Sequence, residues 1–362
     1  MLVLDSHCDA PSQMMRARDF TVDNSWGHVD FPKLKAGGVD ASVFALYCPP
    51  EFGPDKATRY TLDMLAHLYD QLDAAENEAE LAFSADEVRE NKSKGLTSIL
   101  ISMENGAPIQ QSLPMLRLFY RMGVCCMTLA HNADNDICDS CAGQHRWGGL
   151  SPFGREVVRE MNRLGMLVDI AHCSDDTVRD CLELSSAPIV STHSCCKALA
   201  SHRRNLTDEL LKAIADKGGV VQINFCPSFL RDDFDIMMKE SGLGARADEA
   251  EAAFIADPRN PEKVAAWVAV QRELEATDRP SYKDVVDHID HAVRVMGIDH
   301  VGVGTDFDGI TVAPMGLENV SKMPALWDEM RRRGYSSSEI EKVAGGNFLR
   351  VLEEVQNAEF GC

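Results

Sequence analysis

The sequence is poor in positive charge. It has 36 lysines and arginines against 57 aspartates and glutamates, which gives a formal net charge of −21. Nucleic acids and anionic membranes are bound through clusters of basic residues, so this balance argues against both as partners. We therefore expect neither nucleic acid nor membrane among the partners of this chain.

Long apolar segments are also missing. No run reaches the roughly 18 apolar residues that a membrane-spanning helix needs. The first residues enter a short apolar run without the basic segment of a secretory signal. The last residues carry no hydrophobic tail of the kind that precedes a lipid anchor. From these absences we expect a cytoplasmic protein.

Cysteine, in contrast, is abundant, with 12 residues. In a cytoplasmic protein these are expected to be reduced thiols. Cys138 and Cys141 form a C-x-x-C pair, which fits either a redox pair or half of a zinc ribbon. The second pair that a ribbon needs is not present, so we interpret the two as incidental loop cysteines.

Short apolar runs rich in β-branched residues alternate with amphipathic stretches along the chain. Eight such runs are found, at residues 2–7, 41–47, 96–103, 124–130, 166–171, 188–192, 220–225 and 300–305. Eight strands that alternate with helices are typical of an α/β fold of the (β/α)8, or TIM, barrel class. We therefore predict one barrel domain over residues 1–362.

Two features refine this prediction. A charged, alanine-rich stretch at about 227–297 is too long for one barrel helix, so we expect a helical insertion between strands 7 and 8. An open doubly wound sheet is the alternative architecture, and it would require a glycine-rich phosphate loop after a strand. The stretch VGVGTD at 301–306 does not fit that fingerprint.

Histidine, aspartate or glutamate residues stand at the ends of six of the eight apolar runs. In a barrel of this class the carboxyl ends of the strands form the active-site face. A single histidine or carboxylate at such a position often only bonds a loop, but a coincidence of this many is improbable. The residues in question are His7, Asp9, Glu104, His131, His172, His193 and Asp306.

This set of donors suits borderline divalent ions, zinc first. It is too large for one tetrahedral ion, but it fits two ions about 3.5–4 Å apart that share a carboxylate and a hydroxide. Glu104 follows a central strand between the two groups and is the natural bridge. Such sites hydrolyse amides or esters, including phosphate esters.

The pair Arg203 and Arg204 closely follows His193. One interpretation is a solvated surface pair that flanks a helix. The other is a clamp for an anion, since a guanidinium binds a carboxylate through two parallel hydrogen bonds. The residues alone do not decide between the two.

Short motifs surround the residues named above and continue beyond them. They are 5–9 (DSHCD), 103–106 (MENG), 128–132 (TLAHN), 151–158 (SPFGREVV), 168–174 (VDIAHCS), 191–194 (STHS), 201–205 (SHRRN), 304–309 (GTDFDG) and 316–321 (GLENVS). In this order the motifs resemble the membrane (renal) dipeptidase family, the M19 metallopeptidases of the amidohydrolase superfamily. The absence of a signal and an anchor makes the chain similar to the soluble bacterial members.

The resemblance implies a metallo-dependent hydrolase barrel that cleaves dipeptides with two zinc ions. By it, His7 and Asp9 bind one ion, His172 and His193 bind the other, and Glu104 bridges them while a metal-bridging hydroxide attacks the substrate. Family members often accept a D-residue at the C-terminal position and form homodimers, and we expect both here.

The resemblance also implies three roles toward the substrate. His131 would contact the carbonyl of the cleaved bond and stabilise the developing oxyanion. Arg204 would hold the carboxylate of the dipeptide, which favours the clamp interpretation of this pair. Asp306 would carry a proton from the attacking water to the leaving amine.

Two alternatives stay open at this point. The same metals could serve an amidohydrolase-type enzyme that acts on a lactone, a cyclic amide or a phosphotriester. Several such enzymes bridge their ions with a carboxylated lysine, and no lysine ends any of the eight runs. A barrel that binds a metal–ligand complex without turnover is the second alternative, although binding metal alone needs neither Asp306 nor His131.

Overall fold

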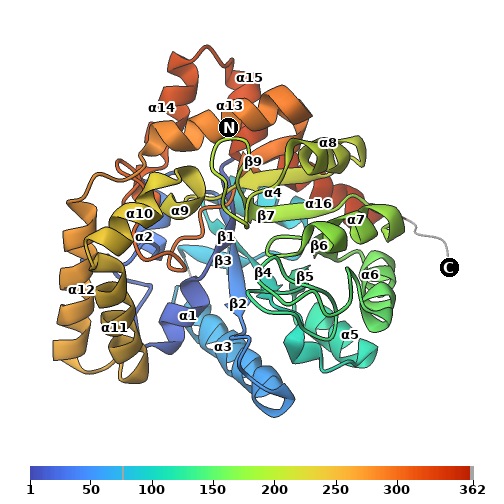
Figure 1. Cartoon of the computed structure of the whole chain (residues 1–362), viewed down its shortest axis with the longest axis horizontal. Helices are drawn as coiled ribbons and strands as arrows, with labels where there is room; N and C mark the ends of the chain where they lie inside the picture. Colours follow the sequence, from blue (N-terminus) through green and yellow to red (C-terminus); the bar gives the residue numbers. More distant parts are fainter. Residues whose placement is uncertain (76, 359–362) are drawn as a thin grey trace.

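The computed structural model describes residues 1–75 and 77–358, and at its centre lies a nearly closed barrel of parallel strands (Figure 1). Each barrel strand is hydrogen-bonded to the next along the chain. This sequential order confirms the predicted (β/α)8 class and excludes a doubly wound sheet. The barrel strands are β1 (Leu4–Cys8), β2 (Ala41–Tyr47), β4 (Thr97–Glu104), β5 (Val124–Thr128), β6 (Leu167–Asp169), β7 (Val190–Ser194), β8 (Val220–Ile223) and β9 (Val301–Val303).

The barrel closes where its first strand meets the segment that follows its last. The backbone N–H of Asp9 donates to Phe307 O at 2.8 Å, and that of Asp306 donates to His7 O at 3.0 Å. The buried carboxylate of Asp5 in β1 accepts from the N–H and hydroxyl of Thr305, at 2.8 and 2.7 Å. The closing seam therefore joins the first barrel strand to the segment after the last one and brings residues 7–9 beside residues 305–307.

Helices surround the barrel, and six of the nine longer ones begin at a serine or threonine whose side chain accepts a backbone N–H of the first turn. The longer ones are α3 (Pro54–Ala74), α4 (Ala85–Lys94), α5 (Leu113–Arg121), α6 (Pro152–Leu164), α7 (Asp175–Leu184), α8 (Asp208–Asp216), α13 (Tyr282–Met296), α14 (Pro324–Arg332) and α16 (Asn347–Asn357). Shorter elements are α1 (Ala10–Met15), α2 (Phe31–Ala36), α15 (Ser337–Glu341), η1 (Ala107–Ile109), η2 (Ile298–His300), η3 (Val320–Lys322) and η4 (Lys342–Gly346).

The stretch expected to form the helical insertion divides into two parts. Four helices, α9 (Pro227–Leu230), α10 (Asp233–Glu240), α11 (Leu243–Ala256) and α12 (Pro261–Glu275), follow β8, and α11 and α12 lie side by side at one edge of the molecule (Figure 1). Their apolar cluster includes Phe254, Trp267 and Leu274, and Val312 of the loop after β9 joins it. Helix α13 instead packs on α8, α14 and the strands β8 and β9, as a barrel helix does.

One strand was not predicted. β3 (Ala79–Leu81) pairs in parallel with β4 alone and stands outside the barrel. Three residues are too few to display the alternation by which a strand is recognised. Its effect is to lead the chain from α3 into α4 before the third barrel strand begins.

The N-terminal mouth of the barrel is covered by α16. Arg350 donates to Gly218 O and Asp299 O on one side, and Gln356 donates to Phe83 O on the other. Apolar side chains of the lower strands form one cluster with those of α16, among them Leu4, Val43, Leu100, Leu167, Val190, Val220, Phe348 and Leu352. Apolar packing therefore fills the N-terminal end of the barrel in the described part of the chain, and a cavity opens at its C-terminal end.

No helix within the described part of the chain is long and apolar enough to cross a bilayer.

Candidate functional site

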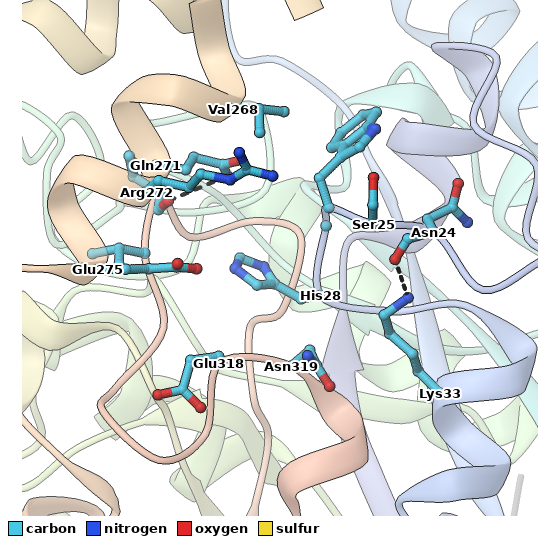
Figure 2. Close-up of a pocket in the computed structure, with 14 residues that line it drawn as sticks. Asn24, Ser25, His28, Lys33, Val268, Gln271, Arg272, Glu275, Glu318 and Asn319 are labelled. Carbon is cyan, nitrogen blue, oxygen red and sulfur yellow. Dashed lines mark hydrogen bonds between the residues drawn. The ribbon is translucent and has the colours of Figure 1, made fainter. Parts of the chain in front are cut away.

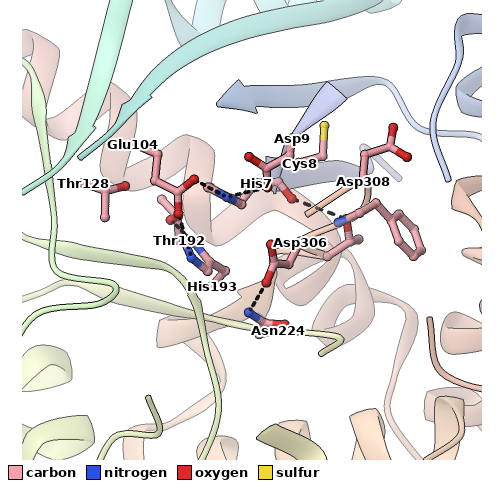
Figure 3. A network of polar contacts seen from close by, with 12 residues as sticks. His7, Cys8, Asp9, Glu104, Thr128, Thr192, His193, Asn224, Asp306 and Asp308 are labelled. Carbon is pink, nitrogen blue, oxygen red and sulfur yellow. Dashed lines mark hydrogen bonds and ion pairs between the residues drawn. The ribbon is translucent and has the colours of Figure 1, made fainter. Parts of the chain in front are cut away.

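The residues predicted at the strand ends meet at the C-terminal mouth of the barrel. Glu104 is the last residue of β4, and His7 and His193 lie in β1 and β7, whereas the others follow their strands in the next turns. Figure 3 shows side chains from opposite sides of the barrel pointing toward one another. Three groups of potential metal donors result: His7, Glu104 and His193; Glu104, His131 and His172; and His7, Asp9 and Asp306.

Glu104 occupies the centre of this arrangement. Its Oε1 lies 3.2 Å from His172 Nε2 and 3.6 Å from His193 Nε2. Its Oε2 lies 3.7 Å from His7 Nε2, which in turn is 3.6 Å from Asp9 Oδ2. One carboxylate oxygen therefore faces each of two donor groups, as expected for a residue between two ions.

The imidazoles of His172 and His193 present lone pairs to each other. His172 Nδ1 lies 3.1 Å from the acceptor Asn132 Oδ1, and His193 Nδ1 lies 2.9 Å from Thr192 Oγ1, whose own proton goes to Asp169. Both Nδ1 atoms are therefore donors, and both Nε2 atoms are unprotonated. These two Nε2 atoms are only 2.9 Å apart. Such a contact between lone pairs is repulsive unless a cation is bound beside them.

The pKa values of His7 and Glu104 also favour a bound cation. Burial would lower the pKa of His7, but the carboxylates of Glu104 and Asp9 outweigh it and raise the pKa to about 10. Burial raises the pKa of Glu104 well above its usual range, and Asp9 adds to the rise. Both ring nitrogens of His7 are buried without a hydrogen-bond partner among the described residues. The raised pKa values show that negative charge exceeds positive charge around His7 and Glu104, and divalent ions would both balance this charge and bind the unpaired nitrogen.

A second layer of residues, which the sequence analysis gave no role, positions these donors. The buried carboxylate of Asp169 accepts from Thr192 N at 2.9 Å, from Thr192 Oγ1 at 2.6 Å and from the hydroxyl of Thr128. It also accepts from Ala171 N, at the turn that leads to His172. Asp169 therefore ties together the ends of β5, β6 and β7, and with them two imidazoles.

The loop after β9 is held in an unusual conformation. Asp306 and Asp308 have φ angles of +60° and +66°, which non-glycine residues rarely adopt. Asp308 forms a buried ion pair with Arg18 and accepts from His28 N at 2.8 Å, and its own N–H donates to His28 Nδ1 at 2.9 Å. These contacts fix the backbone that directs Asp306 into the site.

Asp306 and His131 have opposite electrostatic environments. Burial raises the pKa of Asp306 to about 6, although the nearby His7 lowers it. Asp306 Oδ2 accepts from Asn224 Nδ2 at 2.9 Å, so Oδ1 is the oxygen left to exchange a proton. Burial lowers the pKa of His131 to about 3, and the positive charge of Arg204 contributes. His131 is therefore a neutral imidazole near neutral pH.

A cavity of about 510 Å³ opens above the donors and contains Arg204. Arg204 is only 5% exposed. Its Nη2 donates to His193 O at 3.1 Å, and its Nε is buried without a partner among the described residues. The guanidinium also lies 5.4 Å from the ring centroid of Phe229. A buried cation with an unused donor is suited to an anionic ligand.

A second, smaller cavity of about 140 Å³ lies between the segment 24–28 and α12 (Figure 2). Its lining includes His28, Lys33, Gln271 and Glu275, and Lys33 is already bonded to Asn24 O. The metal-donor groups found in the described part of the chain include no residue from this lining.

The C-x-x-C pair takes no part in the candidate metal site. Cys138 is fully buried and pairs with Leu150 as an isolated bridge, while Cys141 donates its backbone N–H to His172 O at 2.8 Å. The donor groups within residues 1–75 and 77–358 contain no cysteine. The pair thus lies in the loop that packs beside His172.

Known proteins resemble this chain over nearly its whole length. The model of the membrane dipeptidase family (peptidase family M19) matches residues 1–360. Dipeptidase tcpJ of Claviceps purpurea is 32% identical, over 98% of this chain and 77% of its own. The crystal structure of the probable dipeptidase PvdM of Pseudomonas aeruginosa has a TM-score of 0.84 at 28% identity, covering 98% of this chain and 96% of its own.

A second solved structure is a metallopeptidase of Rhodobacter sphaeroides, liganded with a phosphinate mimic of the dipeptide L-Ala-D-Ala. It has a TM-score of 0.81 at 27% identity, over 98% of this chain and 99% of its own. The family match and both structural matches extend across the barrel, the insertion and every strand end described above. The chain therefore belongs to the membrane dipeptidase family, peptidase family M19, and is a metal-dependent peptidase.

Proposed function

We propose that the protein is a dinuclear zinc dipeptidase that hydrolyses the single peptide bond of a dipeptide. The observation that carries this proposal is the presence, in one cavity, of a carboxylate between two donor groups and of the buried Arg204. The first supports binding of two ions, and the second supports recognition of a free carboxylate close to them.

The donors suit zinc because they combine imidazole nitrogen with carboxylate oxygen. His7 and Asp9 would hold one ion, His172 and His193 the other, and Glu104 both. When bound, the two ions would polarise the carbonyl of the substrate and supply an ionised water as the nucleophile.

Arg204 sets the length of the substrate. Its guanidinium would bind the C-terminal carboxylate of the dipeptide, and its burial beside His193 places that carboxylate close to the donor groups. A longer peptide would carry its carboxylate past Arg204 and lose this interaction. Charge-assisted hydrogen bonds of this kind are worth about 1.5–3 kcal/mol each.

His131 and Asp306 would assist the reaction by opposite means. As a neutral imidazole, His131 carries one N–H, which would donate to the carbonyl oxygen as negative charge develops there. Asp306 would accept a proton from the attacking water at Oδ1 and deliver it to the nitrogen of the leaving amine. Its raised pKa suits this transfer, since it lies nearer to neutrality than that of an ordinary aspartate.

The resemblance to the family supports three further proposals. The Rhodobacter sphaeroides relative binds a mimic of L-Ala-D-Ala, so we propose that a D-residue is accepted at the C-terminal position here. We also propose a homodimer, and action in the cytoplasm. A lactone, a cyclic amide or a phosphotriester offers no free carboxylate to Arg204, so the dipeptide is the better substrate.

The function is tested by hydrolysis of L,L- and L,D-dipeptides and of their C-terminal amides, with and without a chelator. We expect metal-dependent cleavage of the acids and a much higher KM for the amides. Arg204→Met should raise KM for the acids about tenfold to a hundredfold, because the carboxylate loses its partner. The amides serve as the control, since they never engage Arg204. Cleavage of lactones or phosphotriesters in preference to every dipeptide would contradict the proposal.

Asp306→Asn tests the proton transfer. The amide retains the size of the side chain but cannot accept the proton, so kcat should fall about 10²–10⁴-fold. Metal content, measured by inductively coupled plasma mass spectrometry, should stay at the wild-type level. Full activity in a variant that retains its metal would remove Asp306 from this role.

Asp169→Asn tests the second layer. The substituted side chain presents an amide where the carboxylate accepts from two hydroxyls, so His172 and His193 should lose their alignment. We expect zinc affinity to fall about 10–100-fold, measured by competition with a chelating dye. The exposed Asp70, changed to asparagine, is the matched control. Equal zinc affinity of the Asp169 variant and the control would show that the alignment does not depend on this carboxylate.

A further inference from the structure

The catalytic cavity holds a positively charged residue that the proposed mechanism does not use. Arg203 precedes Arg204 and lines the same cavity, but it is exposed where Arg204 is buried. We propose that Arg203 binds an acidic side chain on the C-terminal residue, so that the preferred substrates are dipeptides ending in aspartate or glutamate. This inference rests on the proposed function, because it requires the dipeptide carboxylate on Arg204.

Arg203 is not neutralised by an ion pair within the described part of the protein. Many exposed arginines form ion pairs, such as Arg59 with Asp63 at 2.8 Å and Arg246 with Glu273 at 2.7 Å. Other exposed arginines, such as Arg159 and Arg259, form none with the described residues either, but they do not line the catalytic cavity. Arg203 forms no hydrogen bond and no ion pair with any residue in the described part of the chain. In a chain of net charge −21, an arginine without a carboxylate partner at the mouth of the active site is available to a ligand.

The acidic residues nearest to Arg203 are engaged elsewhere. Asp232 and Asp235 line an open hollow on the outer surface, and Arg203 lines the same hollow. Asp232 accepts from the N–H and hydroxyl of Ser201, and Asp235 accepts from the hydroxyl of Ser228. These contacts leave the guanidinium unpaired, although carboxylates are close by.

The cavity contains another arginine, Arg16, which has a carboxylate of the protein near it. Arg16 and Glu251 of α11 both line the cavity, and burial raises the pKa of Glu251 although Arg16 opposes the rise. The carboxylates near Arg203, Asp232 and Asp235, line the outer hollow and not the catalytic cavity. We therefore assign the recognition of a second carboxylate to Arg203.

The wall between the two adjacent arginines suits the stem of an acidic side chain. Phe229 stacks on His202, with ring centroids 4.5 Å apart, and lies under the guanidinium of Arg204. Burial lowers the pKa of His202, which makes its imidazole neutral. The methylene groups of a glutamate or aspartate held by Arg204 can cover this apolar surface while the carboxylate extends outward to Arg203.

The test compares each acidic dipeptide with its neutral isostere: Ala-Glu with Ala-Gln and Ala-Asp with Ala-Asn, with both L- and D-residues at the C-terminal position. An exposed charge pair contributes modestly, so we expect kcat/KM to be about two- to fivefold higher for the acid, mainly through KM. The preference should weaken as salt is added, because the Debye length shortens.

Arg203→Met should bring the acid-to-amide ratio of kcat/KM to about one, while Arg203→Lys should retain part of the preference. The control is Arg121→Met, which changes an exposed arginine at the end of α5 and should leave the ratio at the wild-type value.

A wild-type ratio of one, or a raised ratio that persists in Arg203→Met, would overturn the inference while dipeptide hydrolysis itself stands. Failure to cleave any dipeptide, Ala-Ala included, would overturn the proposed function and this inference with it.

Discussion

Four imidazoles and three carboxylates lie close together at the C-terminal end of the barrel, and the short distances between them determine the rest of the site. The contact between the Nε2 atoms of His172 and His193, 2.9 Å apart, is where the constraint is most severe. The hydrogen bonds of the two Nδ1 atoms keep the ring proton of each imidazole on Nδ1, so neither Nε2 can donate to the other. A bound cation would relieve this contact, and the two carboxylate oxygens of Glu104 face His172 on one side and His7 on the other.

Interactions away from this cluster stabilise the fold around it. The N-terminal end of the barrel is filled with apolar side chains and covered by α16, and burial of this apolar surface stabilises the fold. Asp5 and Asp169 each accept several hydrogen bonds and tie neighbouring strand ends together. The metal donors are thereby held on strands and tight turns rather than on mobile loops.

The barrel strands and the polar residues at their ends were predictable because each strand and its polar residue are adjacent in the sequence. An apolar run that ends in histidine or a carboxylate predicts a strand and a candidate site residue together, and the structure brings His7, Glu104 and His193 close to one another. Asp169 was missed although a signal exists, since a carboxylate inside an apolar run must find partners when the strand is buried. Those partners, Thr128 and Thr192, come from other strands, so only the structure could supply them.

The difference in solvent exposure between Arg203 and Arg204 was not predictable from the sequence. The two are adjacent and chemically identical, and only the turn after β7 buries one and exposes the other. The limits of the insertion were blurred for a related reason. Helix α13 shares the charged composition of the segment before it, but it packs on barrel strands. Composition does not report which helices of such a stretch reach the barrel.

The central claim, that this rim holds two ions on either side of Glu104, is tested most directly by anomalous diffraction at the zinc edge from crystals of the zinc-loaded protein. The account predicts two peaks about 3.5–4 Å apart, one beside His7 and Asp9 and the other beside His172 and His193. A single peak, or none within coordination distance of Glu104, would contradict it.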